Sequence, residues 1–184
     1  MAAAAAPVTA ALTGLSPAEL DACEAVLATM VQDLDLDVAG IFGALRKGLT
    51  MTEALGLPEQ TPDLIYAQAV ARFGAGDHTA ALSLFQALSF LAPGVRDHWL
   101  GLGISARALD QLDLARLAFQ TAAAIAPESA APRFHLCEVL CQQGDWPGAA
   151  REAEAFEAAA MAPEKASLAT DLKRLSALIE LRGG

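Results

Sequence analysis

A repeat of about 34 residues runs through the middle of the sequence. The positions that recur at this spacing are alanines at 81, 115 and 149, phenylalanines at 85 and 119, prolines at 93 and 127, and Gly76, Asp110 and Gly144. A period of this length is typical of a unit of two helices and a turn that stacks on copies of itself, because one unit cannot bury its apolar face alone. The repeat therefore predicts a solenoid of helix pairs.

The middle unit, which begins at Arg96, is the most complete. Its characteristic residues are, in order, Trp99, Leu102, Gly103, Ala115, Phe119, Ala122 and Pro127. This order resembles the tetratricopeptide repeat. Small residues at 103 and 115 allow the two helices of a pair to approach closely, and proline at 127 ends the second helix. We expect an all-α fold with three repeats over residues 62–95, 96–129 and 130–163.

The third repeat is the weakest of the three. Ala153 stands where the other units have phenylalanine, and Met161 stands where they have proline. Terminal units of a solenoid often depart from the pattern because one face meets a cap. Residues 164–184 predict that cap, a final amphipathic helix whose apolar stripe is Leu168, Leu172, Leu175 and Ile179.

The residues before the repeats predict a tail and several short helices. We expect an Ala-rich disordered tail over residues 1–15 and a helical region over 16–57, with a capping box at Ser16–Glu19, a short helix near Val38–Lys47 and a capped turn at Thr50–Glu53. The first of these helices carries an apolar stripe of Leu20, Cys23, Leu27 and Met30. That stripe can pack against the repeats or form a homodimer interface, and the sequence leaves both interpretations open.

Composition excludes several classes of function. The chain is 54% hydrophobic, mostly Ala and Leu, which favours helix over sheet. Its formal charge of −10 repels phosphate backbones and argues against nucleic-acid binding. No uncharged apolar run approaches the ~20 residues that cross a bilayer, so we expect no stable membrane insertion. The first basic residue is Arg46, so a secretory signal is not expected and the predicted location is the cytoplasm.

Neither a metal site nor a catalytic site is expected. Cys137 and Cys141 share a helical face with His135 and Glu138, a set that could be read as metal ligands. Structural zinc, however, uses four ligands from more than one element, so small cysteines packed in a helical core are the better interpretation. The histidines lie in different helical units without matching carboxylates, and no cofactor motif is present. The prediction is a binding protein that is not an enzyme.

Several segments resemble the class II chaperones of type III secretion, the LcrH/SycD family of translocator chaperones, from about Phe42 to Glu157. The segments that carry the resemblance are Gly48–Thr50, Leu64–Tyr66, Ala81–Leu88, Trp99–Gly103, Ala131–His135 and Gln143–Asp145. The resemblance implies a bacterial cytoplasmic protein, commonly a homodimer, that keeps pore-forming translocator subunits soluble and export-competent. It also implies binding of a six-residue Pro-x-Leu-x-x-Pro segment of the client.

Geometry independently favours a peptide groove of that length. Three first helices about 10 Å apart span about 20 Å, which an extended chain covers with about six residues. Positions 5, 9 and 12 of each repeat should face the groove, and they are Tyr66, Val70 and Phe73, then Leu100, Ile104 and Arg107, then Phe134, Glu138 and Cys141. The alternative is that the apolar members only pack between repeats.

Two other binding functions occur among tetratricopeptide repeats. A clamp for the acidic tail of a heat-shock protein needs basic groove residues, and here Tyr66, Val70 and Leu100 occupy those positions on an acidic chain. An adaptor or assembly scaffold in another secretion or pilus machine stays open as the alternative function.

Overall fold

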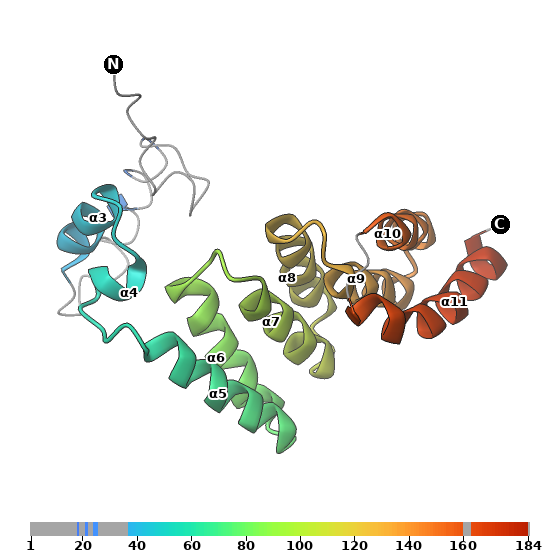
Figure 1. Cartoon of the computed structure of the whole chain (residues 1–184), viewed down its shortest axis with the longest axis horizontal. Helices are drawn as coiled ribbons and strands as arrows, with labels where there is room; N and C mark the ends of the chain where they lie inside the picture. Colours follow the sequence, from blue (N-terminus) through green and yellow to red (C-terminus); the bar gives the residue numbers. More distant parts are fainter. Residues whose placement is uncertain (1–17, 19–20, 22–23, 26–36, 160–162, 184) are drawn as a thin grey trace.

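The computed structural model describes residues 37–159 and 163–183, together with residues 18, 21, 24 and 25. Within this part of the chain every regular element is a helix. The helices are α3 (Val38–Arg46), α4 (Met51–Ala54), α5 (Thr61–Gly74), α6 (His78–Leu91), α7 (Arg96–Ala108), α8 (Leu112–Ile125), α9 (Ala130–Gln143), α10 (Trp146–Ala158) and α11 (Pro163–Gly183). They follow one another along the long axis of the molecule (Figure 1). The predicted all-α solenoid is confirmed.

Helices α5 to α10 form three pairs, α5 with α6, α7 with α8, and α9 with α10. The close approach of the two helices in the middle pair depends on the absence of a side chain at Gly103. A Cβ atom added to Gly103 would lie 2.5 Å from the ring of Phe119, which is completely buried. Ala115, the second small residue expected at this interface, is also fully buried. Small residues therefore set the helix spacing, as the repeat pattern predicts.

The turn inside each pair explains why glycine recurs at the repeat spacing. Gly76 has φ of 80° and Gly144 has φ of 76°, both in the left-handed region that glycine adopts without steric cost. Asp110 occupies the same place in the middle pair with φ of 58°, and is the only residue other than glycine with positive φ among those described. Aspartate tolerates this conformation better than most residues.

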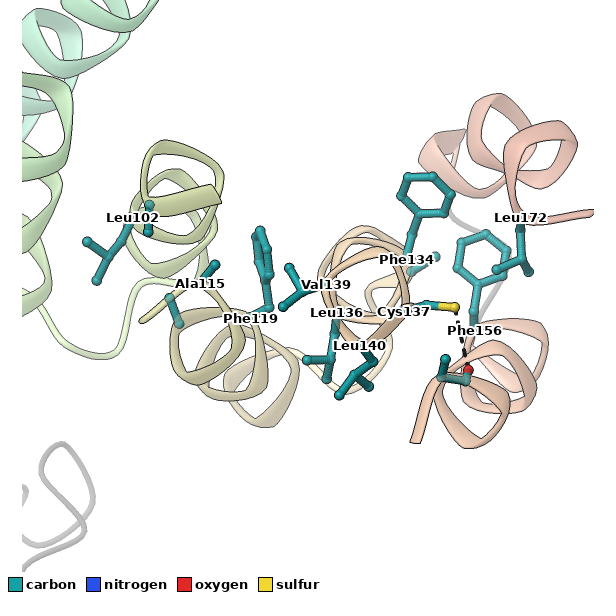
Figure 2. Close-up of a cluster of buried hydrophobic side chains, with 14 of the residues drawn as sticks. Leu102, Ala115, Phe119, Phe134, Leu136, Cys137, Val139, Leu140, Phe156 and Leu172 are labelled. Carbon is teal, nitrogen blue, oxygen red and sulfur yellow. Dashed lines mark hydrogen bonds between the residues drawn. The ribbon is translucent and has the colours of Figure 1, made fainter. Parts of the chain in front are cut away.

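One continuous apolar core runs through the pairs (Figure 2). In the third pair Phe156 is completely buried and fills the core, one turn after Ala153, the residue that occupies the phenylalanine position of the other units. Helix α11 contacts both α9 and α10 and buries Leu172 and Ile179, with Leu168 and Leu175 packed beside them. The expected C-terminal cap is thus observed.

The N-terminal helices pack through Val38, Phe42 and Leu45, all buried. Helix α4 begins with a capping box, in which Thr50 Oγ1 accepts from the backbone N–H of Glu53 at 3.2 Å and the Thr50 N–H donates to the Glu53 carboxylate at 2.7 Å. The expected tail at 1–15, Ser16, and the stripe Leu20, Cys23, Leu27 and Met30 lie outside the described residues. None of the helices described is long and apolar enough to cross a membrane.

Candidate binding groove

The first helices of the three pairs lie on one side of the array. Helix α5 contacts α7, and α7 contacts α9. The second helices approach one another less closely, so the stack curves with α5, α7 and α9 on its inner face. Side chains on this face come from the same turns of successive first helices, which is why repeat positions 5, 9 and 12 were expected there.

A hollow of about 190 Å³ opens on the inner face between the first two pairs. Its lining residues are Tyr66, Val70 and Phe73 from α5, Phe85 from α6, and Asp97, Leu100, Gly101 and Ile104 from α7. Five of these eight are positions predicted from the repeat. The spacing of four and three residues on α5 and of four on α7 places each set on one helical stripe.

The α5 side chains that line the hollow are partly exposed to solvent, and two of them pack against other aromatic rings. Val70 is 49% exposed and Tyr66 is 36% exposed, which is high for large apolar side chains. The ring of Tyr66 meets that of Phe85 edge-on at 5.9 Å, and Phe73 packs on the His78 ring at 4.7 Å. Aromatic side chains held in this way offer a rigid surface that loses little entropy when a ligand binds.

Three lining residues, Phe85, Asp97 and Gly101, were not predicted. Gly101 forms the floor, because a Cβ atom there would lie 2.3 Å from the Phe85 ring. A second glycine two residues before Gly103 is a sequence signal of close approach, although it does not indicate which ring fills the space. Asp97 supplies the polar edge, and its carboxylate pairs with Arg96 at 2.6 Å.

Two of the remaining predicted positions form a charged end to the inner face. Arg107 of α7 is ion-paired with Glu138 of α9, and the His135 ring lies 2.8 Å from the same carboxylate. Burial by itself raises the pKa of Glu138, but the His135 hydrogen bond and the Arg107 charge outweigh it and hold that pKa below its ordinary value. These side chains tie α7 to α9 and do not line the hollow.

The structure places Phe134 and Cys141 away from the hollow as well. Phe134 is only 5% exposed, and its ring packs against Phe156 of α10 at 6.4 Å. The neighbouring thiol of Cys137 donates to the Ala149 carbonyl at 3.4 Å, as the dashed line in Figure 2 shows, and burial raises its pKa to about 12. Across the part of the chain that is described, no three His, Cys, Asp or Glu side chains are arranged to hold a metal ion.

Comparison with solved structures identifies the architecture. A type III secretion complex from Aeromonas hydrophila matches with a TM-score of 0.71 and 27% identity, over 78% of this chain and 96% of that one. The type III secretion chaperone SycD of Yersinia enterocolitica, in complex with a peptide of the translocator YopD, matches with a TM-score of 0.65 and 26% identity, over 69% of this chain and 98% of that one. The chain is therefore similar in fold and sequence to the class II type III secretion chaperones, as its sequence motifs indicate.

A further neighbour from this family is PcrH of Pseudomonas aeruginosa in complex with the chaperone binding region of PopD. Its TM-score is 0.66 at 27% identity, over 70% of this chain and 98% of that one. Another SycD structure is described as an alternative dimer. No protein-family model and no curated protein sequence matches the chain. The repeat pairs described above thus have the same fold as these chaperones at a sequence identity of 26–27%.

Proposed function

We propose that the chain is a cytoplasmic chaperone of a bacterial type III secretion system, with a translocator subunit as its client. An extended client segment of the Pro-x-Leu-x-x-Pro type binds along the inner face, and its leucine enters the hollow between α5 and α7. The chaperone thereby keeps the client soluble and export-competent. No step of this function requires catalysis or a cofactor.

The single observation that carries the proposal is the hollow. Five residues expected at the groove from the repeat alone line it together, although they come from the first helices of two different repeats. Its lining is mainly apolar with one carboxylate at the edge, which suits a leucine side chain beside a polar main chain. The related SycD and PcrH were solved with translocator segments bound.

Binding to a defined probe tests this function. The probe is the fluorescein-labelled peptide Pro-Ala-Leu-Ala-Ala-Pro, hereafter the short probe, in which only the motif residues carry more than a methyl group. Burying its leucine contributes about 1.5 to 3 kcal/mol. Tyr66→Ala and Phe73→Ala should each weaken binding by ~2 kcal/mol, roughly thirtyfold, in fluorescence anisotropy titrations.

Leu117→Ala is the matched control, because Leu117 is a large apolar residue that is 56% exposed on α8 and lines neither the hollow nor the inner face. Circular dichroism should show unchanged helix content in all three variants. Equal affinities for the wild type, Tyr66→Ala and Phe73→Ala would show that the groove is not the binding site.

The alternative function, an adaptor in another secretion or pilus machine, makes a different prediction. Co-expression with neighbouring reading frames should then recover a machine component and no pore-forming subunit. We also propose that the chain forms a homodimer through the region before residue 57, in which the stripe Leu20, Cys23, Leu27 and Met30 supplies the apolar contact.

A further inference from the structure

A second and larger hollow lies outside the groove. Its volume is about 660 Å³, and its walls are the end of α3, α4 with the loops on either side of it, the beginning of α5, the end of α6 and the turn that leads into α7. Four of its lining side chains are large, apolar and solvent-exposed, namely Leu49 at 37%, Leu57 at 38%, Phe90 at 55% and Val95 at 42%. Apolar side chains gathered in this way mark an interaction surface.

Exposed apolar side chains are concentrated at the two hollows. Among the residues described, ten large apolar side chains are exposed, and four of them line the large hollow while Tyr66 and Val70 line the groove hollow. The other four are spread over α5, α8 and α11. Scattered single residues of that kind are ordinary on protein surfaces, whereas two neighbouring clusters are not.

The two hollows adjoin at the beginning of α5 and α7. Pro62 lines the large hollow and Tyr66 lines the groove hollow, four residues further along one face of α5, which is a rise of about 6 Å. On the other side, Val95 lines the large hollow and Asp97 the groove hollow. An extended peptide that leaves the groove at this end reaches the large hollow within about two residues.

The charged residues that line the large hollow are all acidic. Glu53 and Glu59 are among its lining residues, and no lysine or arginine is. The Glu53 carboxylate already caps α4 through Thr50, while Glu59 is exposed at the rim. A ligand that combines bulky apolar side chains with a basic residue complements this surface.

We propose that the large hollow binds a second stretch of the same client, directly flanking the segment held in the groove. This stretch carries one or two bulky apolar side chains against Phe90 and Val95 and a basic residue near Glu59. The inference rests on the proposed function, since it assigns the hollow to the polypeptide that occupies the groove. The chaperone then recognises a longer and more specific segment than six residues.

Extended probes test this inference. Two labelled peptides add Phe-Lys-Leu-Ala to the short probe, one before its first proline and one after its last, because the direction of the bound chain decides which end meets the hollow. One of them should bind the wild type at least about tenfold more tightly than the short probe does, because burying a bulky apolar side chain raises affinity by at least this factor. Phe90→Ser and Val95→Ser should each remove most of this gain and leave short-probe affinity unchanged. Leu117→Ser is the control and should keep the gain.

The basic residue has its own test. Replacing lysine by glutamate in the extension should reduce the gain, and Glu59→Lys in the chaperone should reverse that preference. If neither extension improves on a short probe that binds, the inference fails while the proposed function stands. If no probe binds, both fail. If Phe90→Ser converts a dimer into a monomer in light scattering without changing extended-probe affinity, the occupant is a second copy of the chain and the inference is overturned.

Discussion

Adding one methyl group at Gly101 should deform the groove and destabilise the fold at the same time. The new Cβ would lie 2.3, 2.4 and 2.6 Å from three atoms along one edge of the Phe85 ring. That ring is only 4% exposed and leans on Tyr66, so it cannot swing into solvent without breaking its contacts. Forcing extra volume into a packed site costs about 1 to 3 kcal/mol, whereas glycine to alanine within a helix gains up to about 1 kcal/mol. The net loss should be about 1 to 2 kcal/mol, or roughly 2 to 8 °C in Tm.

Gly103→Ala is a control with the same kind of clash in a different place. Its Cβ would lie 2.5 Å from the fully buried Phe119 ring, and neither residue lines the hollow. Both glycine variants should lose similar stability in thermal melts followed by circular dichroism. Only Gly101→Ala should also weaken the short probe, by roughly tenfold, because the ring that it displaces forms the hollow. Anisotropy should be measured well below the Tm of either variant.

Two results would refute this reasoning. If Gly101→Ala melts at the wild-type temperature or above, the ring does not fill the space that the missing side chain leaves. If Gly103→Ala loses as much affinity as Gly101→Ala, the effect on binding comes from general loosening of the helix pairs. Gly74→Ala, where an added Cβ meets no atom within 4 Å, should leave binding unchanged and melt at the wild-type temperature or slightly above it.

Three further predictions concern the cap, the dimer and pH. Leu172→Ala should lower the free energy of unfolding by about 2 to 5 kcal/mol in urea titrations, because this side chain of α11 is only 2% exposed, whereas Leu181→Ala, 79% exposed on the same helix, should change nothing. Removal of residues 1–31 should give a folded monomer, and light scattering that still reports a dimer would place the interface elsewhere. Burial lowers the pKa of His98 despite its hydrogen bond to the Ala92 carbonyl, so the unfolded chain binds a proton more readily than the folded one. Stability from this residue is therefore complete at pH values above its ordinary pKa of about 6.5 and is lost as the pH falls below it. His98→Asn, which keeps a donor for that carbonyl, should melt with a smaller difference between pH 7 and pH 5 than the wild type.

The fold was predictable because its determinants repeat. A helix pair needs small residues where the helices cross and a left-handed residue at the turn, and both requirements recur once in every unit, at places such as Ala81, Ala115 and Gly144. The third pair shows a limit of prediction from a fixed repeat spacing. Its missing phenylalanine at 153 is replaced by Phe156, one turn later, which no comparison at fixed spacing detects.

The lining of the hollow was predictable only where no other helix among those described covers the inner face. Tyr66, Leu100 and Phe134 hold the same position in successive repeats, yet Phe134 is buried while Tyr66 is exposed. Helix α11 contacts α9 at that end, and Phe134 packs on Phe156, so the position belongs to the core in the last repeat. Periodicity gives the face of a helix, but what lies against that face depends on elements outside the repeat.

The division of the inner face has a consequence for how a client is held. Arg107 and Glu138 pair with each other and tie α7 to α9, so the apolar hollow of the inner face, among the residues described, lies between the first two pairs. A hollow of about 190 Å³ takes one leucine-sized side chain, which by itself provides only modest affinity. A second hollow beside it, on the same polypeptide, would raise affinity through effective concentration without tightening either contact. Each contact would then remain weak enough to open separately, and the proposed client would dissociate one contact at a time.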